Sequence, residues 1–334
     1  MHIVRYRDNG SVRGLAPHGD IGSARGLAPH GDIGSARGLA PHGDRNTSQV
    51  GILADDTITE FADIGTIAEL LRLPETELRE RCASPGGPAV PVADATLLAP
   101  IDGRMELWAA GVTYEQSRSA RVEESERSAT VYEQVYDADR PELFFKSVAW
   151  KVIGPGEPIA IRDDSTVDVP EPELAVVVNG AGAIVGYSVC DDVSSRSIEG
   201  ANPLYLPQAK VFAGGAALGP GIRPAWEVPD PYQLGISLQI DRDATIAWSG
   251  TASTAQLHRR LEDLVRYLRH ADVFPDGVVL STGTCLVPAM PFTLRAGDTV
   301  DIAIDQIGRL RTPVVEGLAA ALSGRDIETN GVTA

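Results

Sequence analysis

The sequence predicts an α+β protein that is mostly β, built from mixed sheets with few helices. The 34 Gly and 23 Pro among 334 residues divide the chain into short segments separated by turns. Runs rich in Val and Ile favour strands, and their uneven spacing argues against a regularly alternating βαβ sheet. The strand candidates are residues 107–112, 167–178, 184–190, 234–240, 278–281 and 299–304.

The first 98 residues predict a small N-terminal α/β domain. Residues 2–12 and 49–52 are expected to pair as a hairpin, and residues 59–73 and 75–82 to form helices. The longer helix is expected because Phe61, Ile64, Ile67, Leu70 and Leu71 would share one face. The Pro- and Gly-rich residues 84–91 are interpreted as a linker. The larger domain is expected at 99–322, with a tail at 323–334.

A tandem repeat interrupts the N-terminal domain at residues 12–44. A 12-residue unit begins at Arg13, returns at Arg25 and returns in part at Arg37, and its copies contain His18, His30 and His42. One interpretation is a histidine array that binds metal. We favour a flexible insertion, because no second ligand accompanies each histidine at helical or strand spacing.

One amphipathic helix is expected in the larger domain, at residues 254–270. Leu257, Leu261, Leu264, Val265 and Leu268 would form its apolar stripe, with His258 and His270 solvated on the polar side. The sequence contains no GxGxxG after a strand and no GxxxxGK[ST], so dinucleotide and P-loop functions have no support.

Charge and cysteine content limit the partners and the location. The formal net charge of −17 argues against a nucleic acid and against an anionic membrane surface. We also expect no membrane span, because no run of about 18 apolar residues occurs. Three cysteines without a CxxC pair, and a start without a signal peptide, predict a cytoplasmic protein.

Three acidic residues carry the candidate chemistry. Glu171 and Glu173 are two apart on a predicted strand, so both carboxylates should share a face, just before the apolar residues 174–178. Pro172 favours a strand edge. Asp191 and Asp192 end a second apolar strand, which could bring Asp192 beside the glutamates.

Three carboxylates without nearby His or Cys form a hard oxygen site, suited to Mg²⁺, Mn²⁺ or Ca²⁺. A 2-oxo acid could occupy two further coordination positions through its carboxylate and carbonyl. The alternative is that these are rim carboxylates, solvated or paired with Arg162 and Arg196. The proposed chemistry would fail if Asp192 lay far from Glu171 and Glu173, or if a basic side chain filled the gap between them.

An ordered series of motifs resembles the fumarylacetoacetate hydrolase family across residues 104–315. The motifs include Leu-Phe-Phe-Lys at 143–146, Pro-Glu-Pro-Glu at 170–173, Asp-Asp-Val-Ser-Ser-Arg at 191–196, Gln-Ala-Lys at 208–210 and Ser-Thr-Gly-Thr at 281–284. The resemblance implies a mixed β-roll, a homodimer and a divalent cation. It implies Glu171, Glu173 and Asp192 as metal ligands, and a substrate pocket bordered by Arg196, Glu199, Lys210, Thr284 and Lys146.

One departure narrows the expected reaction. Hydrolases of this family have a motif like N-Y-x-x-H, and Ser117 stands here where its histidine would be. Residues 110–115 and 202–210 instead resemble the branch that dehydrates 2-keto-3-deoxy sugar acids such as 2-keto-3-deoxyarabinonate. We therefore expect a dehydratase, with an acylpyruvate or fumarylacetoacetate-type C–C hydrolase or an oxaloacetate decarboxylase as the alternative.

The expected mechanism uses the metal as a Lewis acid while a neighbouring group removes a C3 proton. Glu115 and Glu199 are the acid/base candidates and Lys210 the electrophilic helper, although either glutamate could simply be ion-paired. Arg196 could bind the substrate carboxylate or pair with Asp191. A tautomerase, or a non-catalytic protein that retains the fold, is the remaining alternative.

Overall fold

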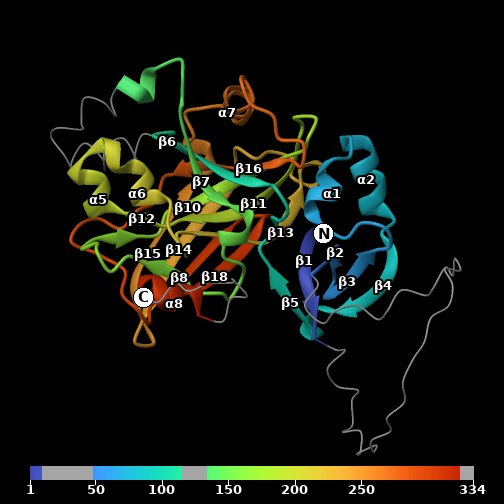
Figure 1. Cartoon of the computed structure of the whole chain (residues 1–334), viewed down its shortest axis with the longest axis horizontal. Coiled ribbons are helices and arrows are strands. Elements are labelled where there is room, and N and C mark those ends of the chain that lie inside the picture. Colours follow the sequence, from blue (N-terminus) through green and yellow to red (C-terminus); the bar gives the residue numbers. More distant parts are fainter. Residues whose placement is uncertain (10–47, 115–133, 324–334) are drawn as a thin grey trace, which may run out of the picture.

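The computed structural model describes residues 1–9, 48–114 and 134–323, and it confirms a mostly β protein with mixed sheets (Figure 1). The tandem repeats with His18, His30 and His42, as well as Glu115 and Ser117, lie outside the described residues. No helix among the described ranges is long and apolar enough to cross a membrane.

An eleven-stranded sheet forms the centre of the molecule. Its order is β4-β3-β2-β1-β13-β11-β10-β16-β6-β7, and β5 pairs with β1 beside this path. The strands are β1 (His2–Asp8), β2 (Gln49–Ala54), β3 (Thr57–Phe61), β4 (Gly86–Pro91), β5 (Ala95–Leu98), β6 (Glu106–Gly111), β7 (Glu142–Val148), β10 (Pro172–Val178), β11 (Ile184–Asp192), β13 (Ala216–Pro224) and β16 (Val278–Thr284).

A second sheet of five strands and a two-stranded ribbon complete the β structure. The second sheet has the order β15-β14-β17-β18-β8, with β8 (Ile159–Ile161), β14 (Gly235–Arg242), β15 (Thr245–Ser253), β17 (Thr299–Ile304) and β18 (Gly308–Glu316). The ribbon pairs β9 (Asp168–Val169) with β12 (Ser194–Ser195). The named helices are α1 (Ile67–Leu71), α2 (Glu75–Ala83), α5 (Arg196–Ala201), α6 (Leu206–Lys210), α7 (Leu261–Leu268) and α8 (Gly317–Leu322).

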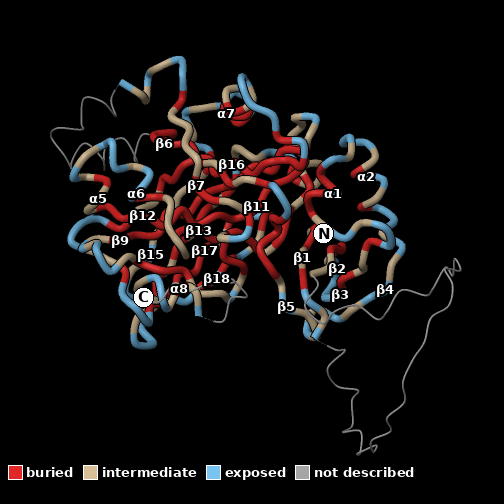
Figure 2. Tube along the Cα trace, viewed as in Figure 1, coloured by how far each residue is buried: buried red, intermediate tan, exposed pale blue. Residues whose placement is uncertain are grey.

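The central strand β10 is buried on both of its faces (Figure 2). Leu174 and Val176 belong to the core cluster that includes the inner residues of β14 and β17. Ala175 and Val177 belong to a second cluster, which includes α1 and α2. Successive side chains of a strand point to opposite faces, so a strand covered on both sides needs a continuous apolar run. This explains the sequence pattern that follows Glu173.

Several expected elements are confirmed. The hairpin is formed by β1 and β2, with Tyr6 opposite Gln49, and the expected strand at 299–304 coincides with β17. Pro172 begins β10 but does not mark a sheet edge, because β10 lies between β11 and β16. The expected strand at 167–178 is divided into β9 and β10.

The expected helix at residues 59–73 is wrong over its first half. Residues 57–61 form β3, and the helix begins only after Thr66, which forms a capping box with Glu69. That signal, Thr-x-x-Glu, is present in the sequence and marks a helix start. The linker expected at 84–91 is also wrong, because residues 86–91 pair with β3 as strand β4.

The helix expected at residues 254–270 is shorter than predicted. α7 begins at Leu261, and Leu261, Leu264, Val265 and Leu268 are its buried face, as expected. His258 and His270 lie outside α7. The backbone N–H of His258 donates to the carbonyl oxygen of Thr113, 2.9 Å away.

The N-terminal strands and the rest of the chain share one sheet, because β1 pairs with β13. Asp102 accepts hydrogen bonds from the first N–H groups of α1, and Asp276 pairs with Arg72 and Arg104. The boundary at residue 98 stays a prediction, and the contacts of Asp102 with α1 and of Asp276 with Arg72 join the two sides of it.

Candidate metal centre

Two strand ends bring the acidic residues together. Glu171 precedes β10, Glu173 lies within it, and Asp192 is the last residue of the neighbouring strand β11. Because β10 and β11 are antiparallel, with Pro172 opposite Asp191, the start of one strand meets the end of the other. One carboxylate oxygen from each residue lies within 4.8 Å of the others, as the sequence predicted.

Glu173 is held by hydrogen bonds from β16. The hydroxyl of Ser281 donates to Glu173 Oε2 at 2.5 Å, and the N–H of Gly283 donates to the same oxygen at 2.8 Å. Gly283 has φ +90°, and a Cβ at this position would lie 2.0 Å from Thr113 Oγ1. Glycine is therefore required where β16 turns its N–H toward the carboxylate.

Two lysines reach the other two carboxylates. Lys210 Nζ lies 2.7 Å from Glu171 Oε2, 3.1 Å from Asp192 Oδ2 and 2.5 Å from Ser194 Oγ. Lys146 Nζ pairs with Asp192 Oδ1 at 2.5 Å, and it donates to the carbonyl oxygens of Val193 and Lys210. Both lysines are about 1% exposed, so these charges lie in a medium where pairing is strong.

Arg196, at the first position of α5, pairs with Glu171 at 2.5 Å, and its Nε lies 3.9 Å from Glu199.

The side chain of Asp191 does not face the side on which Glu171, Glu173 and Asp192 converge. It accepts the backbone N–H of Glu171 at 3.0 Å, and burial raises its pKa to about 8. Burial also raises the pKa of Glu173 well above its usual range, and the negative charges of Asp192 and Glu171 add to this effect.

The oxygen donors of this buried cluster fit a divalent cation. Its carboxylates are Glu171, Glu173, Asp192 and Glu199, and its cations are Lys146, Arg196 and Lys210. The donor set contains only oxygen, as Mg²⁺, Mn²⁺ and Ca²⁺ prefer.

Lys210 counts against a metal here, because its ammonium lies between Glu171 and Asp192. Two points outweigh it. Among the described residues, Glu173 receives hydrogen bonds from Ser281 and Gly283 and forms no ion pair. Lys210 therefore neutralises two of the three carboxylates and not the third. Moreover, the ammonium of a lysine sits on a flexible four-carbon stem, so its position is adjustable.

Comparison with known proteins defines the family. The profile of the fumarylacetoacetate hydrolase C-terminal domain matches residues 107–315, well over half of the chain. The chain belongs to the fumarylacetoacetate hydrolase family.

Two curated relatives and one solved structure are particularly similar. The chain is 43% identical over 265 residues to a probable 2-keto-3-deoxyxylonate dehydratase of Haloferax volcanii, covering 78% of this chain and 90% of the relative. It is 44% identical over 226 residues to 2-dehydro-3-deoxy-D-arabinonate dehydratase of Saccharolobus solfataricus, covering 67% and 76%. A structure of 2-keto-3-deoxy-D-arabinonate dehydratase with magnesium and 2,5-dioxopentanoate has a TM-score of 0.71 and 36% identity, covering 81% of this chain and 96% of that chain.

The solvated-rim interpretation of the three acids is wrong for this member of the family. Glu171, Glu173 and Asp192 are at most 2% exposed. Arg162 pairs with Asp164, whereas Arg196 does pair with Glu171. The carboxylates are therefore buried and compensated, as a metal centre in this fold requires.

Thr284 lies directly opposite Glu173 in the pairing of β16 with β10. Its hydroxyl is 3.1 Å from the carbonyl oxygen of Pro172, so it also ties the two strands together. Its substrate-binding role stays a prediction, as do those of Lys146 and Arg196. Glu199 is buried on α5, 3% exposed, beside Arg196.

Residue-level reasoning missed Ser194, Ser281 and Gly283. Each contacts a predicted site residue, through Lys210 or Glu173. All three occur in the motifs Asp-Asp-Val-Ser-Ser-Arg and Ser-Thr-Gly-Thr. The motifs could have identified these three residues, because buried carboxylates need hydrogen-bond donors and serine hydroxyls and glycine N–H groups can supply them.

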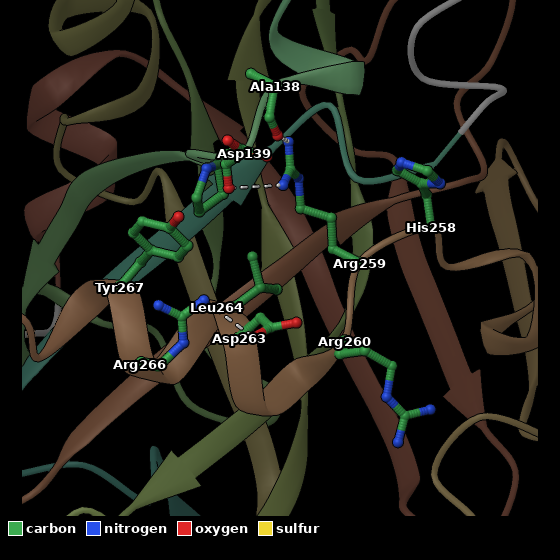
Figure 3. A pocket seen from close by; sticks show the side chains of 10 residues that line it. Ala138, Asp139, His258, Arg259, Arg260, Asp263, Leu264, Arg266 and Tyr267 are labelled. Carbon is green, nitrogen blue, oxygen red and sulfur yellow. Dashed lines mark hydrogen bonds and ion pairs between the residues drawn. The ribbon is translucent and has the colours of Figure 1, made fainter.

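A separate pocket of about 400 Å³ lies where the chain enters α7 (Figure 3). Its walls include His258, Arg259 and Arg266, and none of its lining residues belongs to the carboxylate cluster. Arg259 donates to main-chain carbonyl oxygens of residues 135–139, Arg266 pairs with Asp263, and His258 stacks on Tyr136. The pocket's charged groups thus have structural partners, and we assign it no ligand.

Proposed function

We propose that this chain is a metal-dependent dehydratase of a 2-keto-3-deoxy sugar acid, such as 2-keto-3-deoxyarabinonate, which it converts to 2,5-dioxopentanoate. The observation that carries the proposal is the convergence of Glu171, Glu173 and Asp192 within 4.8 Å. It gains support from relatives at 43–44% identity that are named as dehydratases of such acids.

Glu171, Glu173 and Asp192 would hold the cation, with magnesium favoured because a similar structure contains it. When bound, the cation would supply Lewis acidity toward the 2-oxo acid. Lys210, which already bonds to Glu171 and Asp192, would place its ammonium beside the same substrate oxygens. Arg196 would bind the substrate carboxylate, and Lys146 and Thr284 would border the pocket.

The chemistry requires more than one acid/base step. Loss of a C3 proton and of the C4 hydroxyl, which leaves as water with one added proton, yields a 5-hydroxy-2-oxo-3-enoate. Moving a proton from C5 to C3 gives an enol, and its hydroxyl proton passes to C4 to form the 5-aldehyde. We assign these transfers to Glu199 and Glu115, since two carboxylates can act in sequence as acid and base.

The substrate class follows from the chemistry of 2-keto-3-deoxyxylonate and 2-keto-3-deoxyarabinonate, the acids in the names of the two relatives. Both are five-carbon 2-oxo acids whose single stereocentre is C4, and elimination of the C4 hydroxyl removes that stereocentre. The substrate site at the carboxylate cluster therefore needs to recognise a 2-oxo carboxylate and a leaving hydroxyl group. The proposed acidic and basic residues would recognise both.

The direct test is turnover of 2-keto-3-deoxyarabinonate by the purified chain with Mg²⁺, with 2,5-dioxopentanoate as the measured product. Glu171→Gln and Asp192→Asn should each abolish metal-dependent turnover and leave a folded protein. Asp164→Asn removes a carboxylate that is 59% exposed, and it should retain activity.

Two results would contradict the proposal. Full activity of Glu171→Gln after chelator treatment would remove the metal from the mechanism. Cleavage of acylpyruvates without any dehydration would favour the hydrolase alternative.

We also propose that the protein is a cytoplasmic homodimer. The family resemblance supports the dimer, and three buried free cysteines, Cys82, Cys190 and Cys285, suit a reducing compartment. Light scattering coupled to size-exclusion chromatography tests the dimer, and a monomer at micromolar concentration would contradict it.

A further inference from the structure

Two donors act on the same oxygen of Glu173. The Ser281 hydroxyl lies 2.5 Å from Glu173 Oε2, and the Gly283 N–H lies 2.8 Å from it. Neither of these bonds reaches Oε1. We propose that Ser281 is a positioning residue, which fixes the rotation of the Glu173 carboxylate so that Oε1 is the oxygen presented to the cation.

An irregularity in strand pairing places Ser281 at this oxygen. Glu173 is opposite Thr284, whereas Ala175, two residues later, is opposite Ser281, three residues earlier. β16 therefore has one extra residue at this point, and such a bulge redirects a side chain. Ser281 thus reaches Glu173 although its direct partner in the ladder is Ala175.

The single proton of the Ser281 hydroxyl is directed to Glu173. The Ser281 hydroxyl donates to Glu173 Oε2, and an ionised carboxylate can only accept, so this proton lies toward Glu173. Ser281 is completely buried and Glu173 is 1% exposed, so solvent does not compete for either group.

Loss of this bond should weaken metal binding more than folding. Groups that orient a metal ligand typically contribute 10- to 100-fold to metal affinity or activity when they are removed. Gly283 would still hold Glu173 Oε2 in Ser281→Ala, so the carboxylate would regain rotation while keeping one donor. We therefore expect the lower end, about a tenfold rise in the Kd for Mg²⁺.

The experiment is calorimetric titration of Mg²⁺ into the full-length, metal-free protein, with the melting temperature measured in parallel. Thr282→Val is the matched control, because it removes a buried hydroxyl from the same strand that donates to the carbonyl oxygen of Leu174. Ser281→Cys retains a weaker donor, and it serves as the second variant if Ser281→Ala does not fold.

The inference rests on the proposed metal site, and the outcomes separate the two. A Kd raised about tenfold in Ser281→Ala, with Thr282→Val within twofold of the parent chain, supports the positioning role. An unchanged Kd in Ser281→Ala, or an equal loss in both variants, overturns it while the metal site stands. A parent chain that binds no Mg²⁺ overturns the metal site and this inference with it.

Discussion

Lys210 Nζ lies 2.7 Å from Glu171 Oε2, so the lysine proposed to act on the substrate is also the counter-ion of a proposed metal ligand. The same ammonium lies 3.1 Å from Asp192 Oδ2. A cation that binds these carboxylates must share them with Lys210, which couples metal binding to the position of the lysine.

Lys210→Met is therefore expected to bind Mg²⁺ at least about tenfold more tightly than the parent chain while losing turnover. Removal of a positive charge within about 4 Å of the ligands lowers repulsion by more than the roughly 1.4 kcal/mol that a tenfold change requires. Calorimetric titration measures the affinity. Lys151→Met is the control, because Lys151 lies over the ring of Trp150, outside the cluster. Weaker Mg²⁺ binding in Lys210→Met would show that the ammonium supports the site instead of competing for it.

Gly283→Ala should destabilise the fold by about 2 kcal/mol or more, because it combines left-handed backbone strain with a clash. The added Cβ would lie 2.0 Å from Thr113 Oγ1. Gly156→Ala is a matched control, since Gly156 has φ +78° with nothing within 4 Å of its Cβ position. Urea unfolding should show the larger loss at Gly283. Equal losses in the two variants would mean that the contact with Thr113 relaxes without cost.

Asp276 makes stability depend on pH at the acidic end. Hydrogen bonds from Arg104 and Arg72 lower its pKa to about 2 from an ordinary 3.8. A lowered pKa stabilises the folded state above pH 4, and this contribution disappears as the pH falls toward 2.

Asp276→Asn should accordingly unfold at lower urea concentration than the parent chain at pH 7, and the difference should shrink between pH 4 and pH 2. Urea titrations of both proteins at a series of pH values measure this difference in stability. The contributions of carboxylates that titrate in both proteins cancel in the comparison. A difference that stays constant down to pH 2 would contradict the assignment.

Deletion of residues 13–36, two complete repeat units, should change the melting temperature by less than about 2 °C. The deletion leaves the pairing of β1 with β2 intact. This pairing runs from His2 opposite Leu53 to Tyr6 opposite Gln49, outside the deleted residues. Differential scanning calorimetry makes the comparison. A drop of many degrees would show that the repeats pack against the fold.

Local sequence patterns predicted much of the fold but not its boundaries. The apolar residues 174–178 predicted a buried strand correctly, since only a strand covered on both faces needs such a run. Residues 59–61 were misassigned because Phe61 fits a helical face as well as the buried side of β3. Short apolar segments cannot separate these alternatives without knowledge of what covers them.

The convergence of the three acidic residues was predictable from the sequence, and their supporting contacts were not. Two carboxylates two apart before a buried strand required compensation, whatever the fold, and the structure places Asp192 beside them. Ser281 was not assigned a role, because its approach to Glu173 depends on the irregular pairing of β16 with β10. Pairing irregularities depend on both strands, so neither sequence segment reveals them alone.

The sequence by itself determined the mostly β composition, the set of candidate acidic residues and the family motifs, since these depend on residue types and short spacings. The tertiary structure alone decided that Lys210 lies between Glu171 and Asp192. It also decided that the N-terminal strands extend the central sheet through β1 and β13. Contacts between residues far apart in the chain are fixed by packing and by burial of charge, and no local pattern encodes the distance between two such side chains.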